Sequence, residues 1–120
     1  MTVVAALITR HSTAHATDSF LTIVKGDGNR EIVEDQKPKV VSVKHWRGAL
    51  TYWGLAQYGQ WSTLDWLRRQ AQVASKFSSP EEFGNAIATD LNEEFTKLPL
   101  TNNADKGIGI HFTAYERIND

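Results

Sequence analysis

Apolar and β-branched residues dominate the first half of the chain in short runs separated by turn-forming residues. Residues 2–10 are small, apolar and β-branched, as in a buried strand, and His11-Ser12 then provides a turn. The glycine-rich residues 25–29 suit a hairpin connection between two further strands. Together these patterns predict strands over residues 2–10, 13–18, 20–24, 31–33, 40–43 and 49–53.

Helical periodicity replaces this pattern in the second half of the chain. A first helix is predicted from an N-cap at Ser62 or Thr63 to about Lys76, with Leu64, Leu67, Ala71 and Ala74 on one face. A second is predicted from Ser79 as N-cap and Pro80 as first helical residue, ending near Leu98. Its apolar stripe consists of Phe83, Ile87, Leu91 and Phe95.

A last strand is predicted over residues 108–117. Because a hairpin opens the chain and the helices come late, the expected class is α+β with mainly antiparallel strands. The length of 120 residues predicts a single domain, residues 1–120.

Composition narrows the classes of function. The net charge is −1 with no block of like charge, so a nucleic-acid partner is not expected. No apolar stretch approaches the roughly 20 residues of a membrane span, so no membrane partner is expected either. The absence of cysteine excludes thiolate catalysis and is consistent with a cytoplasmic protein. The histidines match no zinc template, so no metal site is predicted, and the four tryptophans are expected to pack between sheet and helix.

The clearest candidate for chemistry is Thr2. If Met1 is removed, Thr2 carries a free α-amino group and a hydroxyl on the same residue. Such a residue is both nucleophile and base, because its own amine can accept the hydroxyl proton.

The order of polar residues behind Thr2 resembles a known family. Asp18 opens an Asp-Ser-x-x-Thr stretch that ends at Thr22, Lys39 directly precedes a strand, and Gly54 opens a Gly-x-Ala stretch. This order is similar to the proteasome-type branch of the N-terminal-nucleophile (Ntn) hydrolases, over essentially the whole chain.

The resemblance implies a hydrolase that cleaves a peptide or amide bond without a cofactor. Thr2 is the implied nucleophile, Lys39 favours loss of its proton, and Asp18 orients the lysine. The backbone N–H of Gly54 is the implied oxyanion donor. Backbone groups of Thr22 and Ala56 are implied to hold an extended substrate.

The chain departs from the family's pattern in two places. Phe20-Leu21 stand where arginine and a small residue are frequent, and an insertion separates Asp18 from the lysine. Lys37 therefore competes with Lys39, which is preferred because it adjoins the strand.

The implied fold is a four-layer αββα sandwich, of which this chain is expected to form only the N-terminal portion. Faces left uncovered would mean either that the chain is a fragment or truncated form, or that another copy or partner completes it, as in a homo-oligomer or ring. Two other interpretations stay open. One is a catalytically inactive proteasome-like subunit that serves as an assembly or binding module, and the other is an unrelated α+β interaction domain.

Overall fold

The central layer of the protein is a three-stranded antiparallel sheet built from distant parts of the chain. The computed structural model describes residues 4–17, 20–24, 30–34, 39–99 and 107–116. In the central sheet, β6 (Gly48–Gly54) lies between β5 (Val40–Val43) and β9 (Ile108–Thr113). The short 3-10 helix η1 (Lys44–Trp46) joins β5 to β6.

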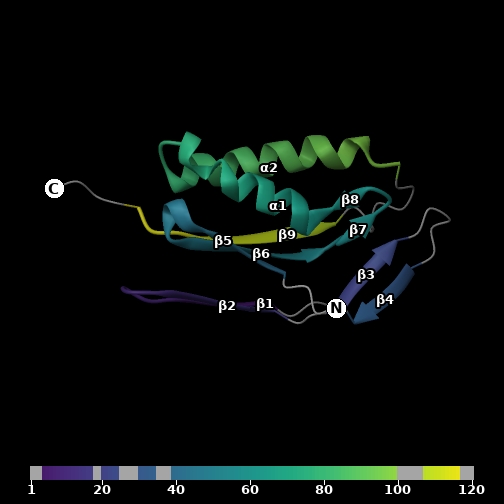
Figure 1. The fold of residues 1–120 in the computed structure, drawn as a ribbon, viewed down its shortest axis with the longest axis horizontal. Helices are drawn as coiled ribbons and strands as arrows, with labels where there is room; N and C mark the ends of the chain where they lie inside the picture. Colours follow the sequence, from purple (N-terminus) through teal and green to yellow (C-terminus); the bar gives the residue numbers. More distant parts are fainter. Residues whose placement is uncertain (1–3, 18–19, 25–29, 35–38, 100–106, 117–120) are drawn as a thin grey trace.

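One face of the central sheet packs against both helices, which lie together above it in Figure 1. They are α1 (Thr63–Gln72), followed by the 3-10 helix η2 (Ala74–Lys76), and α2 (Pro80–Lys97). Alternate residues of β5 and β6 point to this face, as the pleat of a strand requires. They join the helices in a single core that includes Val41, Val43, Leu50, Tyr52, Leu64, Leu67, Phe83 and Ile87.

The N-terminal hairpin lies against the other face of the central sheet (Figure 1). Its strands are β1 (Val4–Ile8) and β2 (Thr13–Thr17), which pair antiparallel. Two hydrogen bonds attach it to the end of β9. His15 Nε2 lies 2.5 Å from Thr113 Oγ1, and the Tyr115 hydroxyl donates to the carbonyl oxygen of Thr9 at 2.6 Å. The layers therefore follow the order helices, central sheet, hairpin.

A third, four-stranded sheet extends the molecule beyond the end of β6. It contains β3 (Phe20–Val24), β4 (Arg30–Glu34), β7 (Gln57–Tyr58) and β8 (Trp61–Ser62), in the order β4-β3-β7-β8. β3 pairs parallel with β7, whereas the other pairs are antiparallel. The sheet connects the β3–β4 hairpin to the segment that leads into α1.

The predicted α+β class and both helices are confirmed, but the end of the first helix is wrong. The sequence predicts helix to about Lys76, whereas α1 ends at Gln72 and Val73 leaves the helical conformation. The chain tightens into η2, where Ala74 is completely buried. None of the described helices is long and apolar enough to cross a lipid bilayer.

The tryptophans fit the expected packing role only in part. Trp66 is buried in the core, and Trp46 and Trp61 pack at its margin. Trp53 is instead 45 % exposed; it lies on the face of β6 that points away from the helices, and the hairpin layer covers it only in part. Its ring covers Gly109 on β9, where a Cβ atom would come within 2.1 Å of the indole.

Candidate functional site

The open end of the N-terminal hairpin is the described structure nearest in sequence to Thr2 and Asp18. Both of these residues lie outside the described part of the chain. Their described neighbours, Val4 and Thr17, stand directly opposite each other in the β1–β2 pair. Thr22 lies in β3, where it pairs with Ile32 of β4.

Contacts between the hairpin and β9 determine which way the hairpin points. Its turn lies at Tyr115, just past the end of β9, and His15 lies further back along β9 at Thr113. Moving away from the turn along the hairpin therefore means moving toward the beginning of β9. That end of β9 pairs with the end of β6, where Ile108 stands opposite Gly54. The open end of the hairpin thus points toward the end of the sheet that carries Gly54 (Figure 1).

Lys39 lies at this same end of the central sheet. It directly precedes β5, and its carbonyl oxygen accepts a hydrogen bond from the backbone N–H of Tyr52 at 3.3 Å. The residue is only 2 % exposed, which is rare for lysine. A buried ammonium group requires polar or charged partners. Lys39 and Gly54 therefore lie at the same end of the central sheet, with Lys39 beside Tyr52 and Gly54 two residues further along β6. Lys37, the competing lysine, lies outside the described residues.

Gly54 ends β6 in a conformation that suits glycine alone. Its φ is +103°, and a Cβ atom would lie 2.2 Å from the carbonyl oxygen of Gly107. That same carbonyl accepts a hydrogen bond from the N–H of Leu55 at 3.2 Å, which fixes the close approach of the two segments. Packing alone therefore accounts for glycine at this position, whether or not its N–H also serves an oxyanion.

A small pocket adjoins the segment that follows Gly54. Its volume is about 170 Å3, and it is lined by Tyr52, Ala56, Gln57, Ser62, Leu64, Asp65 and Arg68. Burial raises the pKa of Tyr52 to about 12; Arg68 opposes this shift and Asp65 adds to it. The phenol is therefore neutral at physiological pH. Ala56 is buried, and its methyl group forms part of the pocket wall. The polar groups of the pocket come from the other lining residues, such as Gln57, Asp65 and Arg68.

Thr63 is a positioning residue that the sequence did not single out for this role. Its side chain is completely buried and donates to the carbonyl oxygen of Leu55 at 2.6 Å. The same hydroxyl accepts from Trp61 Nε1 at 2.9 Å, and the Thr63 backbone N–H donates to the carbonyl oxygen of Ala56 at 3.0 Å. Thr63 thus fixes the backbone of both residues after Gly54. The sequence signal for this role is the Ser62-Thr63 pair. Ser62 caps the helix, so the Thr63 hydroxyl is available to bind the backbone after β6.

The candidate site therefore combines a buried lysine, a conformationally restricted glycine and a small pocket at one end of the central sheet. Within the described ranges, no three histidine or carboxylate side chains are grouped closely enough to hold a metal ion. Comparison with known proteins adds nothing further: no protein-family model, curated protein or solved structure matches this chain.

Proposed function

We propose that the protein is an Ntn-type hydrolase that cleaves a peptide or amide bond with Thr2 as N-terminal nucleophile. The proposal requires removal of Met1, which frees the α-amino group of Thr2. The fold that goes with it is the αββα sandwich, in which the hairpin and central sheet are the two inner layers.

The reaction follows from the groups on these residues. Thr2 Oγ1 attacks the amide carbonyl carbon while its own α-amino group accepts the hydroxyl proton. The resulting oxyanion takes a hydrogen bond from the Gly54 N–H, and the Lys39 charge favours the deprotonated hydroxyl. The C–N bond then breaks, the leaving amine takes the proton, and an ester to Thr2 remains. Water hydrolyses this ester, releasing the acid and restoring the hydroxyl.

The observation that carries this proposal is the direction of the N-terminal hairpin. Val4 and Thr17 pair at its open end, and that end points toward the end of the sheet where Lys39 and Gly54 lie. A hairpin in the opposite direction would carry the N-terminus away from both residues. A pocket of about 170 Å3 lies nearby, between α1 and the segment that follows Gly54.

A second candidate function, a non-catalytic assembly module of the same fold, is favoured by two exposed apolar side chains at the end of β1, one on each face of the hairpin. Leu7 and Ile8 are 63 % and 61 % exposed, and among the described residues they are the most exposed large apolar side chains. In a four-layer sandwich or a homo-oligomer, such residues are covered by a further layer or another subunit.

The hydrolase is tested by intact-protein mass spectrometry followed by assay of a panel of fluorogenic peptide amides. We expect quantitative loss of Met1 and amide hydrolysis that Thr2→Ala abolishes and Thr2→Ser partly retains. Thr89→Ala, at an exposed position of α2, is the matched control and should keep full activity. The hydrolase is excluded if Met1 is retained in the native protein or if Thr2→Ala is as active as the parent.

Light scattering on a sizing column separates the two candidates. Inactivity of every variant together with a defined oligomer that Leu7→Ser and Ile8→Ser dissociate would favour the assembly module. A monomer that hydrolyses amides would eliminate it.

A further inference from the structure

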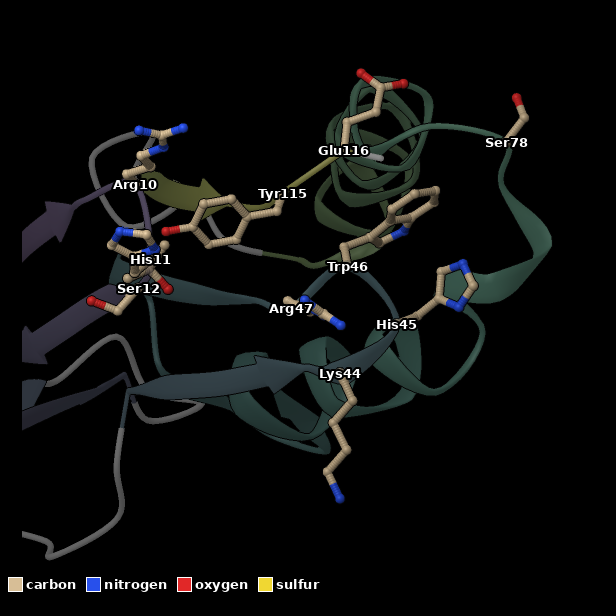
Figure 2. Close-up of a pocket in the computed structure, with 11 residues that line it drawn as sticks. Arg10, His11, Ser12, Lys44, His45, Trp46, Arg47, Ser78, Tyr115 and Glu116 are labelled. Atoms are coloured by element: carbon tan, nitrogen blue, oxygen red, sulfur yellow. The ribbon is translucent and has the colours of Figure 1, made fainter. Parts of the chain in front are cut away.

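A large cleft opens at the other end of the central sheet from Gly54, between the turn of the N-terminal hairpin and η1. Its volume is about 910 Å3. Figure 2 shows the hairpin turn on one side, the turn from β5 to β6 on the other, and the end of β9 between them. Lining side chains come from all three: Arg10 and His11 from the hairpin turn, Lys44 and Arg47 from the turn between β5 and β6, and Tyr115 from the end of β9.

The two sides of the cleft are held in place by Tyr115. Its backbone N–H donates to the carbonyl oxygen of Trp46 at 2.9 Å, and its hydroxyl donates to that of Thr9 at 2.6 Å. The hairpin turn is also closed on itself, because the Thr9 hydroxyl oxygen accepts from the backbone N–H of Ser12 at 3.0 Å. The cleft is therefore preformed, which lowers the entropic cost of binding a ligand.

Arg47 is placed in the cleft by an unusual backbone conformation. Its φ is +49°, and it is the only non-glycine residue with positive φ in the described part of the chain. Its N–H donates to the carbonyl oxygen of Lys44 at 3.1 Å, which closes η1. The next residue, Gly48, is so close to β9 that a Cβ atom would lie 1.9 Å from the carbonyl oxygen of Thr113. Figure 2 shows the Arg47 side chain near the middle of the cleft.

The charge of the cleft is opposite to that of the whole chain. Arg10, Lys44 and Arg47 line it, with Glu116 as the only carboxylate among the lining residues, although the chain has a net charge of −1. Within the described structure, none of the three cations has a carboxylate within ion-pair distance. An excess of cationic residues around a hollow surface attracts anions, because the low-dielectric walls focus the field.

We propose that this cleft binds a small polyanion that carries more than one phosphate group. Arginine suits phosphate because its planar guanidinium presents paired donors to two oxygens. More than one phosphate is expected because Arg10 lies on the hairpin side of the cleft and Arg47 comes from the turn between β5 and β6 (Figure 2). The volume of about 910 Å3 lies within the range of small-molecule sites and exceeds what one phosphate fills.

Isothermal titration calorimetry at low ionic strength tests this proposal with tripolyphosphate and inorganic phosphate as probes. We expect tripolyphosphate to bind with one-to-one stoichiometry and inorganic phosphate to bind more weakly. Arg47→Gly removes the central guanidinium at a position where glycine tolerates the positive φ. It should weaken the binding of tripolyphosphate by about tenfold. Arg69→Gln removes an exposed cation of α1 outside the cleft. This variant should change the affinity for tripolyphosphate by less than about twofold.

Three outcomes would overturn the proposal. They are no tripolyphosphate binding by the parent protein, equal weakening by both arginine variants, and a preference for penta-glutamate peptide over tripolyphosphate. Melting curves for each variant exclude unfolding as the cause of weaker binding. Thr2→Ala should bind tripolyphosphate as the parent does, so failure of the hydrolase proposal leaves this one intact.

Discussion

Gly54 and Gly59 both adopt positive φ, but their surroundings are opposite. Gly54 faces the backbone of Gly107 and Ile108 at distances that exclude any side chain, whereas nothing lies within 4 Å of a Cβ atom added at Gly59. The two positions therefore separate the cost of backbone conformation from the cost of a steric clash.

We expect Gly54→Ala to lower the free energy of unfolding by about 3 kcal/mol or more, since it adds a backbone clash to an unfavourable φ. Gly59→Ala, the matched control, should lower the free energy of unfolding by only about 1 kcal/mol. The φ of +56° is unfavourable for alanine there, but the added Cβ meets no neighbouring atom. Urea unfolding followed by circular dichroism measures both values. Equal costs for the two variants would contradict the close packing of Gly54 against Gly107.

Individual site residues could be predicted only where the signal was local. Lys39 and Gly54 stand out in the sequence because each adjoins a strand end, and the structure places them at one end of the sheet. The importance of Thr63 and Arg47 could not be predicted in this way. Thr63 depends on its contact with Leu55, and Arg47 depends on the approach of Gly48 to β9, so both require the assembled fold.

At the scale of elements, hydrogen bonds from Thr63 join the start of α1 to the segment that follows β6. We expect Thr63→Val, which keeps the shape but removes the hydroxyl, to lower the free energy of unfolding by about 1–3 kcal/mol. The cause is that the buried carbonyl of Leu55 and the indole N–H of Trp61 lose their partner.

Thermal and urea unfolding measure this effect, with Thr89→Val as the control at an exposed site of α2. The control should change stability by less than about 0.5 kcal/mol. A Thr63→Val protein as stable as the control would show that the hydroxyl does not hold the segment after Gly54.

The elements themselves differ in how far local sequence determines them. α2 is predicted to within a residue because its signals are local: Ser79 accepts from the N–H of Glu82 at 3.1 Å, and Pro80 begins the helix. The end of α1 depends instead on the burial of Ala74 in the core. β7 and β8 contain two residues each, too few to display a period, and they exist because β3 pairs with β7.

At the scale of the whole molecule, the attachment of the hairpin to the central sheet depends in part on a neutral histidine. His15 contacts Thr113 through Nε2, while its Nδ1 is buried without a partner in the described structure. Burial, and then the neighbouring charge of His111, lowers the pKa of His15 below its usual 6.5. A proton on His15 therefore binds more tightly to the unfolded chain than to the folded protein.

This difference predicts that stability falls on acidification. Well above pH 6.5, His15 is neutral in both states and its full contribution is present. As the pH falls below 6.5, the unfolded chain takes up the proton first, and the loss continues until the pH passes the lowered pKa of the folded state. His15→Gln does not titrate, so it should lose less stability than the parent between about pH 7.5 and pH 5. The measurement is the urea midpoint at each pH.

His45→Gln is the control for this pH series, because His45 is exposed in η1 and is not among the groups that shift the pKa of His15. It should follow the pH dependence of the parent protein, since its removal leaves His15 and His111 in place. If His15→Gln and His45→Gln change the pH dependence equally, the layer contact does not depend on a neutral His15. The hairpin that directs the N-terminus toward Lys39 and Gly54 would then be held by its other contacts, such as the bond from Tyr115 to Thr9.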